Sequence, residues 1–150
     1  MKISKIIILS LFFFTSCGYN ALNKLSDYNF GISKIELDGN RSINFILNES
    51  FERLTQKNSN REFDLRGNSS FSKFVISKDS SGNATSYKIE IIINLEIFEN
   101  NKPLKEITFQ KDTNFNNLNS QFELKQYENV LLEDLTRQLV MDINYYLSTL

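Results

Sequence analysis

The stretch from residue 87 to residue 98, YKIEIIINLEIF, does most to determine the fold of this chain. Every second position is apolar, and these positions are Tyr87, Ile89, Ile91, Ile93, Leu95 and Ile97. The positions between them are mostly polar: Lys88, Glu90, Asn94 and Glu96. Because successive side chains of a strand point to opposite faces, this pattern predicts a long strand with one buried face.

The segment before this strand is predicted to be its hairpin partner. Residues 71–79 are rich in β-branched and aromatic side chains, and they precede Ser81-Gly82-Asn83-Ala84. The Gly-Asn pair suits a two-residue primed turn. In that register Phe74 lies opposite Ile91 and Ile76 lies opposite Ile89, so the buried faces of the two strands coincide.

The segment after the central strand predicts a second hairpin. Lys105, Ile107, Phe109, Lys111 and Phe115 follow the turn residues Asn100-Asn101-Lys102-Pro103. Pro103 suits the start of a strand. For Ile107 and Phe109 to share the buried face, the loop must contain an odd number of residues, because a slip of one residue reverses the two faces.

The remaining periodic segments are one strand and two helices. Residues 28–37 alternate in polarity but slip in phase near Ser33 and Lys34, which predicts a bulged strand. Apolar residues at helical spacing predict a helix over 43–54, capped by Asn40 or Ser42, and a long amphipathic helix over 124–150. The expected fold is therefore α+β: a single domain over 28–150 in the order β-α-β-β-β-α, with two helices packed on one face of a mostly antiparallel four-stranded sheet.

The N-terminus reads as a lipoprotein signal peptide over residues 1–16. Lys2 and Lys5 precede an apolar run of nine residues, 6–14, which only Ser10 interrupts. This run is shorter than the roughly 18 residues of a membrane span, so we expect export and cleavage. Phe14-Thr15-Ser16-Cys17 resembles a lipobox, which predicts lipidation of Cys17 and an anchored tether over 17–27. The residue after Cys17 is Gly18, whereas an aspartate at this position retains many lipoproteins at the inner membrane. Delivery to the outer membrane is therefore favoured.

Composition excludes several kinds of chemistry. The chain has no histidine and a single cysteine, which removes Ser-His-Asp and Cys-His catalysis and zinc sites built from His or Cys. Removal of Lys2 and Lys5 with the leader changes the net charge from −1 to −3, which gives no overall attraction to nucleic acid. We therefore expect no catalytic residue, metal or cofactor. A carboxylate-based hydrolase remains an alternative, with the candidate pairs Glu90 and Glu96, or Glu133 and Asp134, although all four belong to polar faces.

Two short segments and the order of elements suggest a family. The segments are Ser16-Cys17-Gly18-Tyr19 at the anchor and 131–139, LLEDLTRQL, in the last helix. With the β-α-β-β-β-α order, the mature chain resembles the LptE (RlpB) family of lipopolysaccharide-assembly lipoproteins. The resemblance implies a two-helix, four-stranded fold seated in the lumen of LptD, the outer-membrane barrel that delivers lipopolysaccharide.

Basic side chains carry the lipopolysaccharide contacts that this resemblance implies. Our candidates are Lys73, Lys78 and Lys88, because the predicted hairpin places Lys78 beside Tyr87 and Lys73 on the polar face near Glu90. Ordinary solvated lysines are the simpler interpretation of each. The expected partners are an LptD-type barrel, lipopolysaccharide and, through the lipid anchor, the membrane. The alternative function is an accessory lipoprotein of another envelope lipid-transport system of the ABC type.

Overall fold

The computed structural model describes residues 29–55, 59 and 61–150. Within them the elements are β1 (Gly31–Gly39), α2 (Arg41–Thr55), β2 (Glu62–Lys78), β3 (Ala84–Glu99), β4 (Lys102–Asn116) and α3 (Gln121–Thr149). The strands form one sheet in the order β1-β2-β3-β4. The predicted β-α-β-β-β-α order and the single α+β domain are confirmed.

Strand β3 lies inside the sheet and supplies the middle of the hydrophobic core. Its alternate residues are at most 1% exposed: Ile89, Ile91, Ile93, Leu95 and Ile97. Glu90 is half-buried and Glu96 is exposed on the other face. The predicted one-faced strand is confirmed, because the two faces of β3 differ in polarity and in burial alike.

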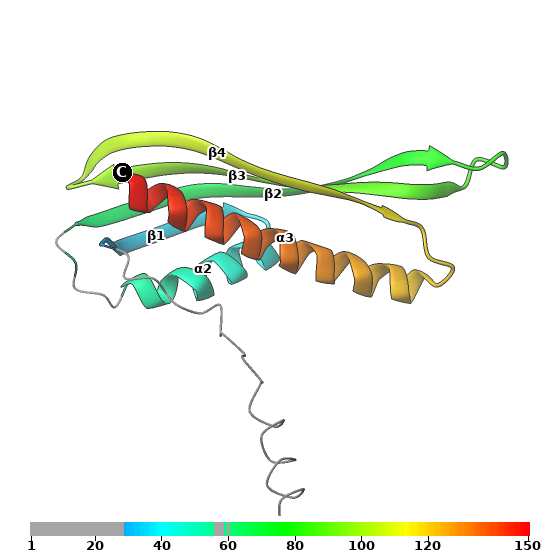
Figure 1. The fold of residues 1–150 in the computed structure, drawn as a ribbon, viewed down its shortest axis with the longest axis horizontal. Coiled ribbons are helices and arrows are strands. Elements are labelled where there is room, and N and C mark those ends of the chain that lie inside the picture. The colour runs from blue at the N-terminus through cyan, green and yellow to red at the C-terminus, as the bar shows by residue number, and fades with distance from the viewer. Residues whose placement is uncertain (1–28, 56–58, 60) are drawn as a thin grey trace, which may run out of the picture.

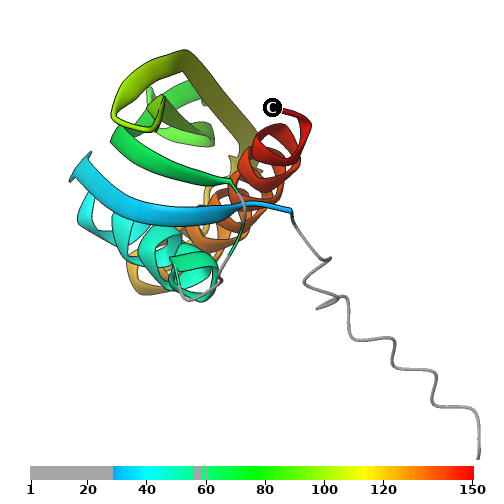
Figure 2. The ribbon, with the colours of Figure 1, turned by 90° about the vertical axis from the view of Figure 1, so that its left-hand side faces the viewer.

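Both helices lie on the same side of the sheet, as the two ribbon views show (Figures 1 and 2). Helix α2 contacts mainly β1, while α3 contacts β3 and β4. The Asn40 side chain caps α2 by accepting hydrogen bonds from the backbone N–H groups of Ser42, at 3.0 Å, and Ile43, at 3.2 Å. Ser120 caps α3 by accepting from the N–H of Glu123. Asn40 rather than Ser42 is therefore the cap of the first helix.

Strand β1 pairs in parallel with the first half of β2, so the sheet is mixed. Its register shifts between Ile32 and Lys34, which confirms the bulge that the slip in phase predicted. The strand ends at Gly39, whose φ of +99° brings its Cα against the carbonyl of Ser69. A Cβ at Gly39 would lie 2.0 Å from that oxygen, so only glycine fits where β1 turns into α2.

The predicted register of the first hairpin is wrong by three residues. Phe71, not Phe74, lies opposite Ile91, and Lys73, not Ile76, lies opposite Ile89. The reason is the turn. The backbone N–H of Gly82 donates to the carbonyl oxygen of Asp79 at 3.0 Å. The backbone N–H of Asp79 donates to the carbonyl oxygen of Asn83 at 2.9 Å.

These two bonds enclose a three-residue loop, 80–82, in which Gly82 takes a φ of +86°. Since three is an odd shift, Phe74 moves to the face away from the helices.

Strand β2 also begins well before the predicted residue 71. The apolar alternation of Phe63 and Leu65 belongs to it, but the polar run 67–70 hides that continuity in the sequence. Gly67 lies where a Cβ would come within 3.0 Å of the Leu37 and Leu95 side chains. A glycine in this strand thus reflects close packing rather than a loop.

The second hairpin has the predicted faces but not the predicted loop. Ile107 pairs with Leu95 and Phe109 with Ile93, as expected. The loop contains two residues, Asn100 and Asn101, which have φ values of +52° and +61°. A register shift after Ile97 supplies the odd residue instead, so a bulge restores the alignment of the faces.

Cys17, the leader and the tether lie outside the described residues, so their predicted processing and lipidation stay predictions. Among the described residues, neither helix is both long enough and apolar enough to cross a bilayer.

Candidate functional site

The end of the β2–β3 hairpin extends beyond both helices at one end of the molecule (Figure 1). We call residues 70–88 the arm, because β1 pairs with β2 only as far as Ser69. At the tip of the arm, the Asp79 carboxylate accepts hydrogen bonds from the backbone N–H groups of Ser81, at 2.8 Å, and Asn83, at 2.9 Å. These hydrogen bonds from Asn83, and then from Ser81, lower the pKa of Asp79. The arm therefore has a fixed tip but only part of the sheet's usual cover.

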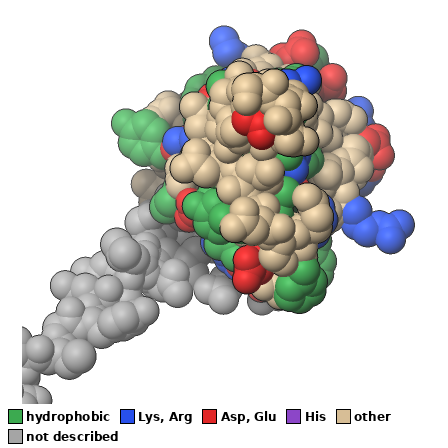
Figure 3. Space-filling model, turned by 90° about the vertical axis from the view of Figure 1, so that its right-hand side faces the viewer, with side chains coloured by type: hydrophobic (Ala, Val, Ile, Leu, Met, Phe, Trp, Pro, Cys, Tyr) green, Lys and Arg blue, Asp and Glu red, His purple; other side chains and the backbone are tan. Residues whose placement is uncertain are grey.

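Three adjacent apolar side chains of the arm are about half exposed: Phe74 at 50%, Val75 at 48% and Ile76 at 50%. Figure 3 looks onto this end of the molecule, where hydrophobic side chains reach the surface among mostly uncharged groups. Elsewhere on β2 the large apolar residues Phe63 and Leu65 are buried. The arm thus concentrates apolar surface in one strand segment.

An ion pair joins the base of the arm to α3. Because Lys73 lies opposite Ile89, it shares the face that the helices cover, and its Nζ contacts the Glu128 carboxylate. Glu128 is only 7% exposed, and its second oxygen lies 3.7 Å from the Nζ of Lys125. The Lys73 ammonium also lies 4.0 Å from the centre of the Tyr87 ring. A buried carboxylate of this kind requires its cation, so the contact fixes the arm against the helix.

Aromatic rings continue this junction toward the start of α3. Phe115 stacks on Tyr87 with ring centres 5.5 Å apart, and it meets Tyr127 edge to face at 5.9 Å. Beside them lies a hollow of about 520 Å³, which we call the aromatic groove; its lining residues are Ile76, Ser86, Asn114, Phe115, Asn116, Leu118 and Tyr127. The groove carries no ionised side chain, so it can accept apolar or neutral groups.

The three lysines predicted to bind a ligand do not form one cluster. Lys73 lies on the covered face, not on the polar face near Glu90, and it is already paired with Glu128. Lys78 lies opposite Ala84, not beside Tyr87. Lys88 is on the outer face between Glu90, at 3.3 Å, and Asp112, at 3.5 Å. The wrong hairpin register is the source of both misplacements, and a ligand role for each lysine stays a prediction.

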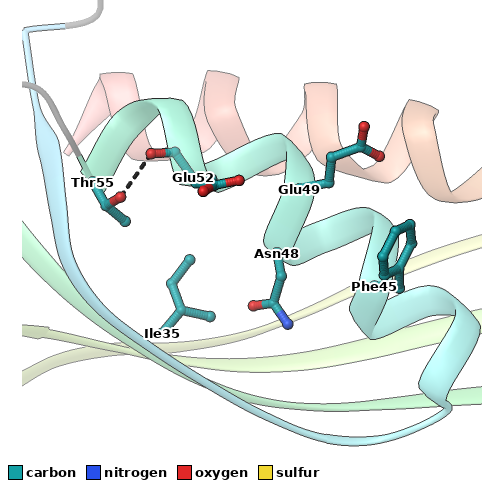
Figure 4. A pocket seen from close by; sticks show the side chains of 6 residues that line it. All are labelled: Ile35, Phe45, Asn48, Glu49, Glu52 and Thr55. Carbon is teal, nitrogen blue, oxygen red and sulfur yellow. Dashed lines mark hydrogen bonds between the residues drawn. The ribbon is translucent and has the colours of Figure 1, made fainter.

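Two further hollows lie near α2. Figure 4 shows one of about 530 Å³, lined by Ile35, Phe45, Asn48, Glu49, Glu52 and Thr55. The other, of about 500 Å³, lies where α2 and α3 meet and carries arginines and glutamates together, in particular Arg41, Arg137, Glu49 and Glu133. The first has two carboxylates and no cation, so it is unsuited to an anionic ligand.

Sequence reasoning missed Glu128 and the aromatic groove. Glu128 is the only carboxylate buried in the described part of α3, and its helical neighbours Leu124 and Leu135 are buried too. The sequence did contain a signal for a buried ion pair: Glu128 lies within the apolar stripe 124–131–135, and a charged residue is rarely found on a buried helix face without a partner. In the described residues no three His, Cys, Asp or Glu side chains gather as a metal site would require.

Comparison with solved structures identifies the fold. Rare lipoprotein B from Shewanella oneidensis superposes with a TM-score of 0.61 at 13% identity, covering 77% of this chain and 94% of that one. A minor lipoprotein from Acinetobacter baumannii gives 0.52 at 12% identity, covering 76% and 92%. No protein-family profile and no curated protein matches the sequence. The likeness to rare lipoprotein B, the protein of the RlpB family, is confirmed as a likeness of fold.

Proposed function

We propose that this chain is an outer-membrane lipoprotein, anchored through Cys17, which binds an LptD-type barrel and supports lipopolysaccharide assembly. The observation that carries the proposal is the shared fold: almost the whole of rare lipoprotein B aligns with the described domain. The lipobox-like Phe14-Thr15-Ser16-Cys17 adds an anchor of the matching kind. Several acyl chains on Cys17, at about 0.8 kcal/mol for each buried methylene, would make the attachment permanent.

In this proposal the activity is contact rather than catalysis. The sequence contains no histidine, and its only cysteine is the proposed site of lipidation. Two of the carboxylates that a hydrolase could use already have hydrogen-bond partners. Glu90 accepts a hydrogen bond from Gln110, and Glu133 accepts one from Arg137. Carboxylates that are already hydrogen-bonded on the polar faces of a strand and a helix support a structural role rather than that of a catalytic acid or base.

We place the barrel contact on the arm. Phe74, Val75 and Ile76 offer adjacent apolar side chains on a segment that Asp79 and Lys73 hold in position. An interface core needs desolvated apolar groups in a fixed arrangement, because ordering a flexible loop on binding costs affinity. The pairing of Lys73 with Glu128 supports a positioning role for that lysine in this contact.

Depletion of the chain in its native host tests the proposed function. We expect mature barrel and surface lipopolysaccharide to fall together, before general loss of envelope integrity. Wild-type chain should restore both, and Cys17→Ala should not become labelled by palmitate. Normal barrel assembly with normal surface lipopolysaccharide after complete depletion would reject the export role and favour the alternative, an accessory of another lipid-transport system.

A further inference from the structure

The arm has an open backbone edge on the side where β1 ends. In the sheet order β1-β2-β3-β4, strand β2 has two neighbours up to Ser69 and only β3 beyond it. The carbonyl of Ser69 still accepts the N–H of Asn40 at 3.0 Å on that side. Backbone groups of a strand alternate in direction, and the register runs without a shift to Val75. The N–H and C=O groups of Phe71, Lys73 and Val75 therefore point to the open edge.

This edge has fewer protecting residues than the other edges. Strand β1 presents Lys34, Glu36 and Asp38 along its length. Strand β4 presents Pro103 and a series of charged residues, Lys102, Lys105, Glu106, Lys111 and Asp112. Charges and proline on an edge strand oppose pairing with another chain. The open edge of β2 has two lysines, of which Lys73 is paired with Glu128, and no proline; Phe71, Phe74 and Val75 are residues that fit an added strand.

Charge indicates what kind of strand would pair there. From Ser70 to Lys78 the edge has two lysines and no carboxylate, although the whole chain has a net charge of −1. Lys73 is engaged with Glu128, whereas Lys78 makes no ion pair within the described residues. A strand carrying carboxylates is therefore complementary to this edge, and a basic strand is not.

A second copy of this chain fits less well. Antiparallel pairing that joins the outward groups of Phe71 and Val75 places two copies of Lys73 opposite each other, which is unfavourable.

We propose that residues 70–78 of β2 accept an extended, acidic strand from a partner protein, which adds to the sheet through the backbone of Phe71, Lys73 and Val75. Main-chain hydrogen bonds supply the affinity in this mode, and alternate side chains supply the selectivity. The exposed Phe74 and Val75 then each meet a side chain of the added strand on one of the two faces. The inference does not rest on the barrel role, because any envelope protein with such a strand would fit.

Amide hydrogen exchange on the full mature chain tests this inference. The probe is a seven-residue peptide that alternates valine and glutamate. We expect it to slow exchange of the Phe71, Lys73 and Val75 amides at least about tenfold, while the Ser72 and Phe74 amides, which already face β3, do not change. A twin peptide with alternate N-methylated amides should give no protection, and a twin with lysine in place of glutamate should protect less.

Protein variants provide a second arm of the test. Val75→Pro removes one outward N–H and should abolish protection of Phe71 and Lys73, whereas Val75→Ala keeps that N–H and should retain it. The wild-type exchange pattern decides the question if Val75→Pro fails to fold. No slowing at millimolar peptide, equal slowing by the N-methylated or lysine twins, or protection that rises with protein concentration alone would each overturn the proposal; the last would assign the edge to a second copy.

Discussion

The two halves of the β2–β3 hairpin are built from the same two strands but differ in what covers them. In the half next to the helices, Ile91 and Ile93 are fully buried. In the arm, Val75 lies on the same face of the sheet, opposite Tyr87, and is still 48% exposed. Burial therefore follows from the position of the helices along the strands and not from the apolar content of the strands. The first half stabilises the fold, and the second presents surface.

The largest expected effect is on the free energy of unfolding, which should fall much more for a substitution in the covered half of the hairpin than for one in the arm. Ile91→Ala removes fully buried methyl groups and should lower the free energy of unfolding by about 2–5 kcal/mol. Phe74→Ala removes a half-exposed ring and should cost about 1 kcal/mol or less. Urea titration of both variants measures the difference. Equal losses would show that the arm is packed as tightly as the core.

The sequence predicted the covered half well because its signal is local. Strict alternation from Tyr87 to Ile97 determines which face is buried, whatever pairs with it. The arm was predicted less well because its register depends on the turn. The Gly82-Asn83 pair suggested two loop residues, whereas the Asp79 carboxylate and the positive φ of Gly82 stabilise three. The different loop shifts the register by three residues, which moves Phe74 to the other face and Lys73 toward α3.

The ion pair between the arm and α3 should have the next largest effect. Lys73→Met leaves the buried Glu128 carboxylate with only Lys125, at 3.7 Å, and should cost about 1–3 kcal/mol. Replacing both Lys73 and Glu128 by methionine should recover most of that loss, because no buried charge is then left unpaired. A double-mutant cycle in urea gives the coupling energy. A cycle that closes with additive losses would show that the contact does not fix the arm.

The smallest effect concerns pH and the tip of the arm. Hydrogen bonds from Asn83 and Ser81 lower the pKa of Asp79 from its ordinary value of 3.8. The stabilisation is therefore present above about pH 4 and is lost as the pH falls through the lowered pKa. Amides of the tip should exchange faster below that range while those of Ile91 and Ile93 stay protected. Asp79→Asn should remove the pH response, and an unchanged response in this variant would assign it to another group.

The anchor could be predicted only from the sequence, and the contact surface only from the structure. Cys17 lies outside the described residues, and its role depends on the short apolar run and the lipobox-like residues before it. The exposure of Val75 depends on where α3 begins relative to the turn, and that of Phe74 depends on the register that the turn sets; the apolar pattern alone encodes neither. Under the proposed function, the anchor would hold the domain at the membrane while the arm presents a fixed, partly apolar strand.

Co-purification of the barrel with arm variants tests the central claim most directly. The triple variant Phe74→Ser, Val75→Ser, Ile76→Ser changes the arm, and Phe45→Ser changes an aromatic side chain that is 69% exposed on α2 as a matched control. From detergent-solubilised outer membrane, the triple variant should recover at least about tenfold less barrel than wild type, while Phe45→Ser recovers a normal amount. Equal recovery by both variants, with each shown to be folded, would contradict the account.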